Sequence, residues 1–104
     1  MRSDIPSATI ARMDPVRGNK VMFYTYVLKS EKDGKCYTGC TNDLRKRLSQ
    51  HNNGESTYTK NRGPFIVIYY EACLSKGHAM AREKYLKTGM GKRYLKNRLG
   101  ASYL

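Results

Sequence analysis

The sequence lacks tryptophan and contains only three prolines and three cysteines among its 104 residues. Cys36, Cys40 and Cys73 are widely placed, without the paired spacing of a secreted disulfide framework, which indicates a reducing, cytoplasmic compartment. With His78 they make four candidate zinc ligands, but no C-x2-C pair is present. We therefore interpret the cysteines as small buried hydrophobes.

Long apolar runs are also missing. Residues 1–21 carry four basic and two acidic side chains and no apolar run, which excludes a signal peptide or a membrane span there. We expect a flexible tail at 1–21, one domain at 22–100 and a short tail at 101–104. One compact domain is what a chain of this length allows.

Acidic residues are scarce, with 8 Asp and Glu against 20 Lys and Arg, for a net charge of +12. The tail accounts for +2 of this, so the domain itself is basic. Such a charge implies a polyanionic partner, with nucleic acid first and an acidic membrane surface second. No amphipathic helix with a broad exposed apolar face supports the membrane alternative, so we expect no membrane partner.

Hydrophobic patterning predicts three strands and three helices. Residues 23–29 and 35–40 have strand character, and a continuous apolar run at 65–70 predicts a third, central strand. Helices are predicted at about 43–52, 76–88 and 91–99. The fold class is therefore α/β, more closely α+β: a small three-stranded antiparallel or mixed sheet flanked by about three helices.

Helix boundaries follow from capping residues. Thr41 or Asn42 can cap the first helix, and Asn52-Asn53-Gly54 stops it. Ser75 caps the second helix, and Thr88-Gly89 closes it.

Two tyrosine tripeptides, Tyr24-Thr25-Tyr26 and Tyr37-Thr38-Gly39, flank the hairpin signal Asp33-Gly34. With an even number of loop residues, Tyr26 and Tyr37 project from the same face. A two-residue turn leaves Tyr26 about 13 Å along the strand from the position opposite Tyr37, whereas a wider loop sets the phenols opposite each other. The residues alone leave both registers open.

Two helices add polar groups beside apolar stripes. Leu44 and Leu48 form the stripe of the first helix, with Arg47 and His51 on its shoulder. In the second helix Ala79, Glu83, Leu86 and Met90 share a stripe, which sets one carboxylate toward the sheet. A buried Glu83 requires an arginine, a tyrosine or a metal ion as partner. An ion pair with Lys87 or Arg82 on the helix surface is the alternative.

Together, phenols, an arginine, a histidine, a lone carboxylate and a cationic surface suit phosphodiester hydrolysis. The carboxylate can hold one divalent cation, the arginine can stabilise transition-state charge, and a phenol or imidazole can take the proton of the attacking water. A tyrosine base needs a cationic or metal-lined environment to lower its pKa from about 10, and this chain is rich in cations.

The ordered set of motifs over about residues 23–96 resembles the GIY-YIG nuclease family. The two tripeptides match its two name-giving motifs, and the segment from Gly39 to Asn52 is similar to its helix motif. Tyr69-Tyr70-Glu71 and the helix bearing Glu83 follow in order. Tyr24-Thr25 replaces the family's Gly-Ile, and Asn97 is the candidate for its late asparagine. The small, single-domain bacterial branch fits best.

The resemblance implies roles for five residues. Tyr26 is the candidate general base, Tyr37 its positioning partner and His51 a supporting proton-handling group. Arg47 would stabilise the phosphate, and Glu83 would hold a single Mg²⁺ or Mn²⁺.

We predict a metal-dependent DNA endonuclease that acts in DNA repair or recombination. Its cutting would be structure-selective, on flap or branched DNA, or weakly sequence-specific. A larger protein partner would direct it to its target. The predicted nucleic-acid contacts are Arg45, Lys46, Tyr58, Lys60, Arg62, Lys92, Arg93 and Lys96. The alternatives are a non-catalytic nucleic-acid-binding module with the same fold and a basic RNA- or ribosome-associated structural protein.

Overall fold

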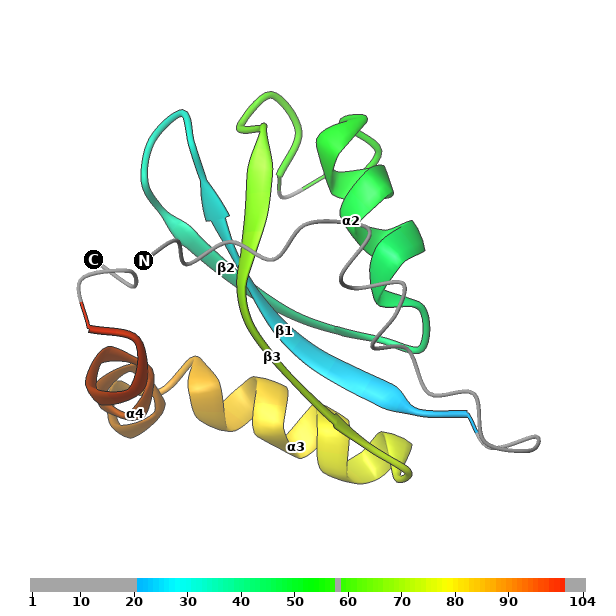
Figure 1. The fold of residues 1–104 in the computed structure, drawn as a ribbon, viewed down its shortest axis with the longest axis vertical. Coiled ribbons are helices and arrows are strands. Elements are labelled where there is room, and N and C mark those ends of the chain that lie inside the picture. Colours follow the sequence, from blue (N-terminus) through cyan, green and yellow to red (C-terminus); the bar gives the residue numbers. More distant parts are fainter. Residues whose placement is uncertain (1–20, 58, 101–104) are drawn as a thin grey trace.

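The computed structural model describes residues 21–57 and 59–100. Along these residues the elements are β1 (Phe23–Ser30), β2 (Cys36–Thr41), α2 (Leu44–Asn52), β3 (Phe65–Cys73), α3 (Lys76–Leu86) and α4 (Gly89–Leu99) (Figure 1). The predicted class, a three-stranded sheet with three helices, is confirmed, and both strand pairs are antiparallel. The tails predicted at 1–21 and 101–104 fall outside the described residues, apart from Val21. No helix in the described ranges is long and apolar enough to cross a membrane.

The strand order is β2-β1-β3, so the prediction that β3 is central was wrong. The central strand is β1, which pairs on both edges. β3 has a continuous apolar run for another reason, because both of its faces are covered. Alternation along β3 sends Val67 into one core and Ile68 into the other. A bulge, where Val27 pairs with Tyr69 and Leu28 with Val67, leaves Ile68 as the extra residue, so Ile68 and Tyr69 both pack on the same core.

Two hydrophobic cores lie on opposite faces of the sheet, which runs between α2 and α3 in Figure 1. The core on the α2 side, hereafter the α2-side core, comprises Tyr24, Tyr26, Leu28, Leu44, Leu48, Phe65 and Val67. The core beneath α3 and α4, the α3-side core, comprises Val27, Ile68, Leu86 and Leu95. The alternation of side chains along β1 supplies both cores from one strand.

Capping contacts set the helix ends. Asp43, not Thr41 or Asn42, caps α2, because its carboxylate accepts from Lys46 N while the Thr41 hydroxyl accepts from Asp43 N. The predicted stop of α2 and the Ser75 cap of α3 are confirmed.

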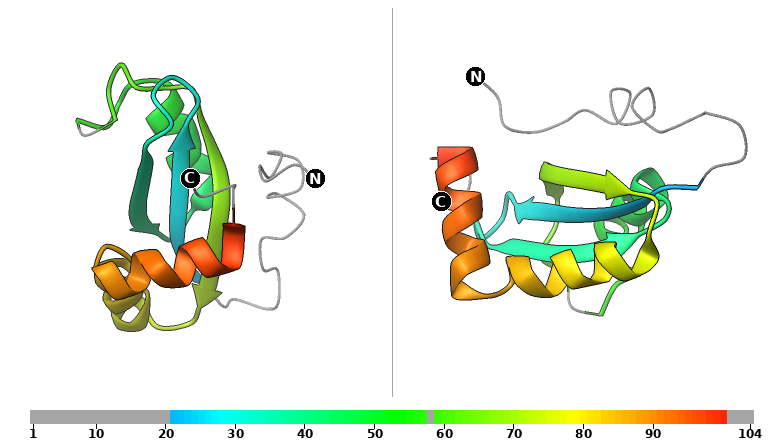
Figure 2. Two further views of the ribbon diagram at one scale, coloured as in Figure 1. Left: turned by 90° about the vertical axis from the view of Figure 1, so that its left-hand side faces the viewer. Right: turned by 90° about the horizontal axis from the view of Figure 1, so that it is seen from below.

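The second predicted helix ends earlier than expected. Thr88 does not close α3 but caps α4, accepting a hydrogen bond from Gly91 N. Met90 consequently belongs to α4 and is 69% exposed, so the predicted stripe on α3 ends at Leu86. The new cap turns the chain, and α4 crosses the end of α3 steeply (Figure 2).

Close packing fixes α3 and α4 on the sheet. The buried Thr25 hydroxyl donates to Ala79 O at 2.7 Å, which ties β1 to α3. At the α3–α4 junction a Cβ on Gly91 would overlap Tyr85 O and lie 2.5 Å from Leu86 Cα, so only glycine allows this approach.

Candidate active site

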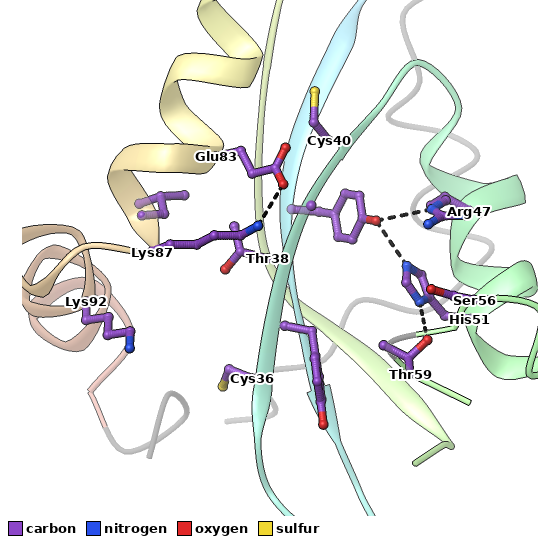
Figure 3. Close-up of a pocket in the computed structure, with 14 residues that line it drawn as sticks. Cys36, Thr38, Cys40, Arg47, His51, Ser56, Thr59, Glu83, Lys87 and Lys92 are labelled. Carbon is purple, nitrogen blue, oxygen red and sulfur yellow. Dashed lines mark hydrogen bonds and ion pairs between the residues drawn. The ribbon is translucent and has the colours of Figure 1, made fainter. Parts of the chain in front are cut away.

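Three predicted site residues form one hydrogen-bonded chain. The Tyr26 hydroxyl lies 3.0 Å from His51 Nε2 and accepts from Arg47 Nε at 3.4 Å (Figure 3). The other ring nitrogen of His51, Nδ1, lies 2.6 Å from the Thr59 hydroxyl. Arg47 Nη1 also donates to Gln50 Oε1 at 3.0 Å, which steadies the guanidinium. A phenol, an imidazole and a guanidinium thus meet at one oxygen.

Apolar packing positions Tyr26, Arg47 and His51. Tyr26 sits on the central strand and is 3% exposed. In α2, Leu44 and Leu48 are buried, and this orientation sets Arg47 and His51 on the helix shoulder, as the spacing predicted. The buried His51 and half-buried Arg47 therefore face the sheet rather than solvent.

The strand register brings Gly39 opposite Tyr26. A Cβ on Gly39 would overlap the Tyr26 hydroxyl oxygen and lie 2.5 Å from Cζ, so the phenol rests directly on the glycine backbone. Tyr37 pairs with Leu28, two residues along β1 from Tyr26. The two phenols share a face as predicted, in a register between the two that the sequence left open.

Tyr37 is held by packing. Its ring meets Phe65 edge-on, with centroids 5.5 Å apart, and it remains half-buried beside Tyr26 in the same cavity. Tyr37 packs against the α2-side core, which contains Tyr26. Among the described contacts, no hydrogen bond joins Tyr37 to Tyr26.

Glu83 reaches the same cavity from α3, across strand β2. Figure 3 shows Glu83 and Lys87 on one side of β2 and Arg47 and His51 on the other. The cavity, of about 580 Å³, is lined by Tyr26, Arg47, His51 and Glu83 together. The Glu83 side chain is 26% exposed, and its Oε2 accepts from Lys87 Nζ at 2.9 Å. Of the partners foreseen for Glu83, the lysine ion pair is the one observed.

Burial dominates the electrostatics of Tyr26 and His51. Burial, helped by the Arg47 charge, lowers the pKa of His51 from 6.5 to about 4, so the imidazole is neutral at pH 7. Burial also raises the pKa of Tyr26, even though Arg47 acts to lower it. The cations of the protein alone do not lower the pKa of Tyr26, because one arginine does not offset the desolvation of a phenol at the centre of the sheet.

Comparison with known proteins fits this geometry. The family described as the GIY-YIG catalytic domain matches residues 22–97 of the chain. The chain belongs to the GIY-YIG family.

Bacterial relatives of this GIY-YIG domain carry the name UPF0213. One from Clostridium perfringens is 48% identical over 67 residues, covering 64% of this chain and 71% of that protein. One from Staphylococcus saprophyticus is 42% identical over 74 residues, covering 70% and 89%. The solution NMR structure of a UPF0213 protein from Bacillus halodurans covers 79% of this chain and 90% of its own, at 34% identity and a TM-score of 0.49.

A divalent cation, which the GIY-YIG family implies, has one acidic ligand available in the cavity. Among the described residues, Glu83 is the only carboxylate that lines it. No group of three or more His, Cys, Asp or Glu side chains suited to a metal ion occurs in the described ranges. Mg²⁺ commonly uses one or two carboxylates and completes its shell with water and substrate phosphate, so Glu83 fits such an ion.

The predicted cationic contacts of the GIY-YIG domain divide by location. Lys92 lines the cavity itself. Arg45 and Lys46 line a separate shallow hollow on α2 with Asp43 and Ser49. The other described contacts are exposed: Lys60, Arg62, Arg93 and Lys96. Arg62 forms an ion pair with Asp33 at 3.6 Å, and Tyr58 lies outside the described residues.

Sequence reasoning missed Thr59, Ser56 and Lys87 as cavity residues. Thr59 and Ser56 belong to a polar loop whose composition matches any turn, so no local pattern distinguishes them. Lys87 was considered only as an ion-pair partner, although its position one helical turn after Glu83 places both in the same cavity.

Proposed function

We propose that this domain is a divalent-metal-dependent endonuclease that hydrolyses DNA phosphodiester bonds. The observation that carries the proposal is the convergence of Tyr26, His51 and Arg47 at one hydroxyl oxygen, in a cavity that also contains Glu83. A base, a cationic donor and a carboxylate are what hydrolysis of a phosphate diester requires.

The proposed roles follow from the donor and acceptor inventory. Arg47 uses two of its five N–H donors within the protein, which leaves donors for a phosphate oxygen. Neutral His51 accepts the Tyr26 proton while the Tyr26 oxygen accepts that of the attacking water, and an anionic phosphate nearby stabilises the imidazolium. As the water oxygen bonds to phosphorus, the P–O bond to the leaving sugar oxygen breaks, and that oxygen takes a proton from solvent. A divalent cation held by Glu83 supplies further neutralisation of charge on the scissile phosphate when bound.

The substrate we propose is branched or flap DNA, or duplex DNA cut with weak sequence preference, in repair or recombination. The cationic residues lie on α2, the loop after it and α4, and contacts of this kind bind phosphates rather than read bases. Affinity should fall steeply with salt.

The experiment is cleavage of labelled single-stranded, duplex, flap and branched DNA with Mg²⁺, Mn²⁺ or EDTA. We expect metal-dependent cutting by the wild type, lost by about 100-fold or more in Arg47→Ala and Glu83→Gln. Lys84→Ala, at an exposed position of α3 outside the cavity, and Glu31→Gln, at an exposed turn, are matched controls. Cutting that persists in EDTA, or in both site variants, would contradict the proposal.

A second candidate is a nucleic-acid-binding module without turnover. The Lys87 ammonium at 2.9 Å from Glu83 favours it, because the carboxylate is already neutralised without a metal ion. Such a module binds DNA equally well with Glu83→Gln and never cuts the panel.

A further inference from the structure

Both ring nitrogens of His51 have partners, although a neutral imidazole has only one proton. Nε2 faces the Tyr26 hydroxyl at 3.0 Å, and Nδ1 faces the Thr59 hydroxyl at 2.6 Å. One nitrogen must therefore donate and the other accept. Hydroxyls satisfy either arrangement, so a third group has to decide which tautomer forms.

Arg47 is that third group, because a guanidinium has donors only. Its Nε donates to the Tyr26 oxygen at 3.4 Å and so occupies a lone pair of that oxygen. This leaves the Tyr26 oxygen one lone pair and one proton, and the arrangement that directs the proton to His51 Nε2 pairs it within the protein. In that arrangement Nε2 accepts, and Nδ1 bears the proton and donates to Thr59.

Thr59 is built into this position. Thr59 is 1% exposed. Two backbone hydrogen bonds also hold it: Thr59 N donates to Ser56 O at 3.2 Å, and Arg62 N donates to Thr59 O at 3.1 Å. His51 is 6% exposed. A Nδ1–H group buried this deeply needs a protein acceptor, because its desolvation would otherwise be uncompensated.

We propose that Thr59 is a positioning residue that holds His51 as the Nδ1–H tautomer, with the Nε2 lone pair directed at the Tyr26 hydroxyl. The role of that lone pair in hydrolysis rests on the proposed function, but the tautomer itself does not. Thr59 touches no reacting atom and acts only through His51.

The test measures the tautomer directly, by ¹⁵N NMR of the imidazole at pH 7 in the full chain. We expect a pyrrole-type shift for Nδ1 and a pyridine-type shift for Nε2 in the wild type. Thr59→Val, which keeps the shape but removes the hydroxyl, should mix the tautomers or reverse them, and Thr59→Ser should restore the wild-type pattern. The exposed His78, the other histidine of the chain, is an internal reference whose signals stay unchanged.

The proposal is overturned if the wild type bears its proton on Nε2, or if folded Thr59→Val keeps the wild-type tautomer. If Thr59→Val does not fold, the wild-type spectrum and Thr59→Ser still decide. In DNA cleavage, Thr59→Val should lower kcat about 10- to 100-fold with KM unchanged, the loss typical of an outer-shell partner. A domain with the expected tautomers and no cleavage would refute the nuclease and leave this inference intact.

Discussion

Gly39 lies opposite Tyr26 in the β1–β2 pair, and its missing side chain is the space that the phenol occupies. The hydroxyl that meets Arg47 and His51 is therefore positioned as much by a neighbouring strand's glycine as by its hydrogen-bonding partners.

Replacement of this glycine should displace the phenol. In Gly39→Ala the new methyl group overlaps the Tyr26 hydroxyl, so we expect DNA cleavage to fall about 100-fold and stability to fall by about 1–3 kcal/mol. Single-turnover cleavage and urea unfolding measure the two effects. Gly89→Ala is the control, because a Cβ there meets nothing within 4 Å. A Gly39→Ala protein with wild-type cleavage would show that the phenol's position is unimportant.

Stability should depend on pH through His51. The unfolded chain takes up a proton near pH 6.5 and the folded protein near pH 4, so the unfolded state binds more protons between these values. The free energy of unfolding is therefore unaffected by His51 titration above pH 6.5. It declines as the pH falls from 6.5 toward 4, by up to about 1.4 kcal/mol per pH unit. Urea unfolding at several pH values should show a shallower dependence for His51→Gln than for the wild type.

His78→Gln is the matched control for this pH series, since His78 is exposed on α3 and should leave the wild-type dependence in place. Equal dependence in the wild type and His51→Gln would mean that His51 titrates alike in both states.

Glu71 should stabilise the attachment of α3. Its carboxylate accepts from Arg82 Nε at 2.7 Å and Nη2 at 3.0 Å, and from the Tyr69 hydroxyl at 2.8 Å. Burial raises the pKa of Glu71, but the hydrogen bonds from Arg82 and Tyr69 outweigh it and hold the pKa below its ordinary value. Glu71→Ala should therefore cost about 1–3 kcal/mol in the urea-unfolding free energy. Glu31→Ala, at an exposed turn, should change it by less than about 0.5 kcal/mol.

Lys87 should weaken cation binding at Glu83. Because its ammonium lies 2.9 Å from the carboxylate, a metal ion must displace or tolerate it. Lys87→Met should tighten Mn²⁺ binding about 2- to 10-fold. The lower bound corresponds to the energy of a surface i,i+4 ion pair, and the upper bound to the repulsion between unscreened charges in water. Electron paramagnetic resonance titration of Mn²⁺ measures this, with the exposed Lys84→Met as control. Equal affinities in all three proteins would place the cation elsewhere.

Local patterns predicted much of this structure. The hairpin signal Asp33-Gly34 and the Leu44–Leu48 spacing predicted that Tyr26, Tyr37, Arg47 and His51 could share one face of the sheet, and they do. Period-2 and period-3.6 rules suffice there, because each concerns one element or two consecutive strands.

Long-range relationships were less accessible. The central position of β1 depends on pairing with β3, far along the chain, and the raised pKa of Tyr26 depends on its burial among residues of α2 and β3. Thr59 reaches His51 only through the path of a loop, for which no periodic pattern exists. The pairing of Arg82 with Glu71 rather than Glu83 likewise requires the packing of α3 on the sheet.

The α2-side and α3-side cores each support a different part of the site. Tyr26 belongs to the first, and Leu86, on the helix that bears Glu83, belongs to the second. Tyr26 and Glu83 therefore depend on packing on different faces of the sheet, although β1 contributes to both cores. A few substitutions confined to one face of the sheet could therefore displace the Tyr26 hydroxyl and leave the Glu83 carboxylate in place, or the reverse.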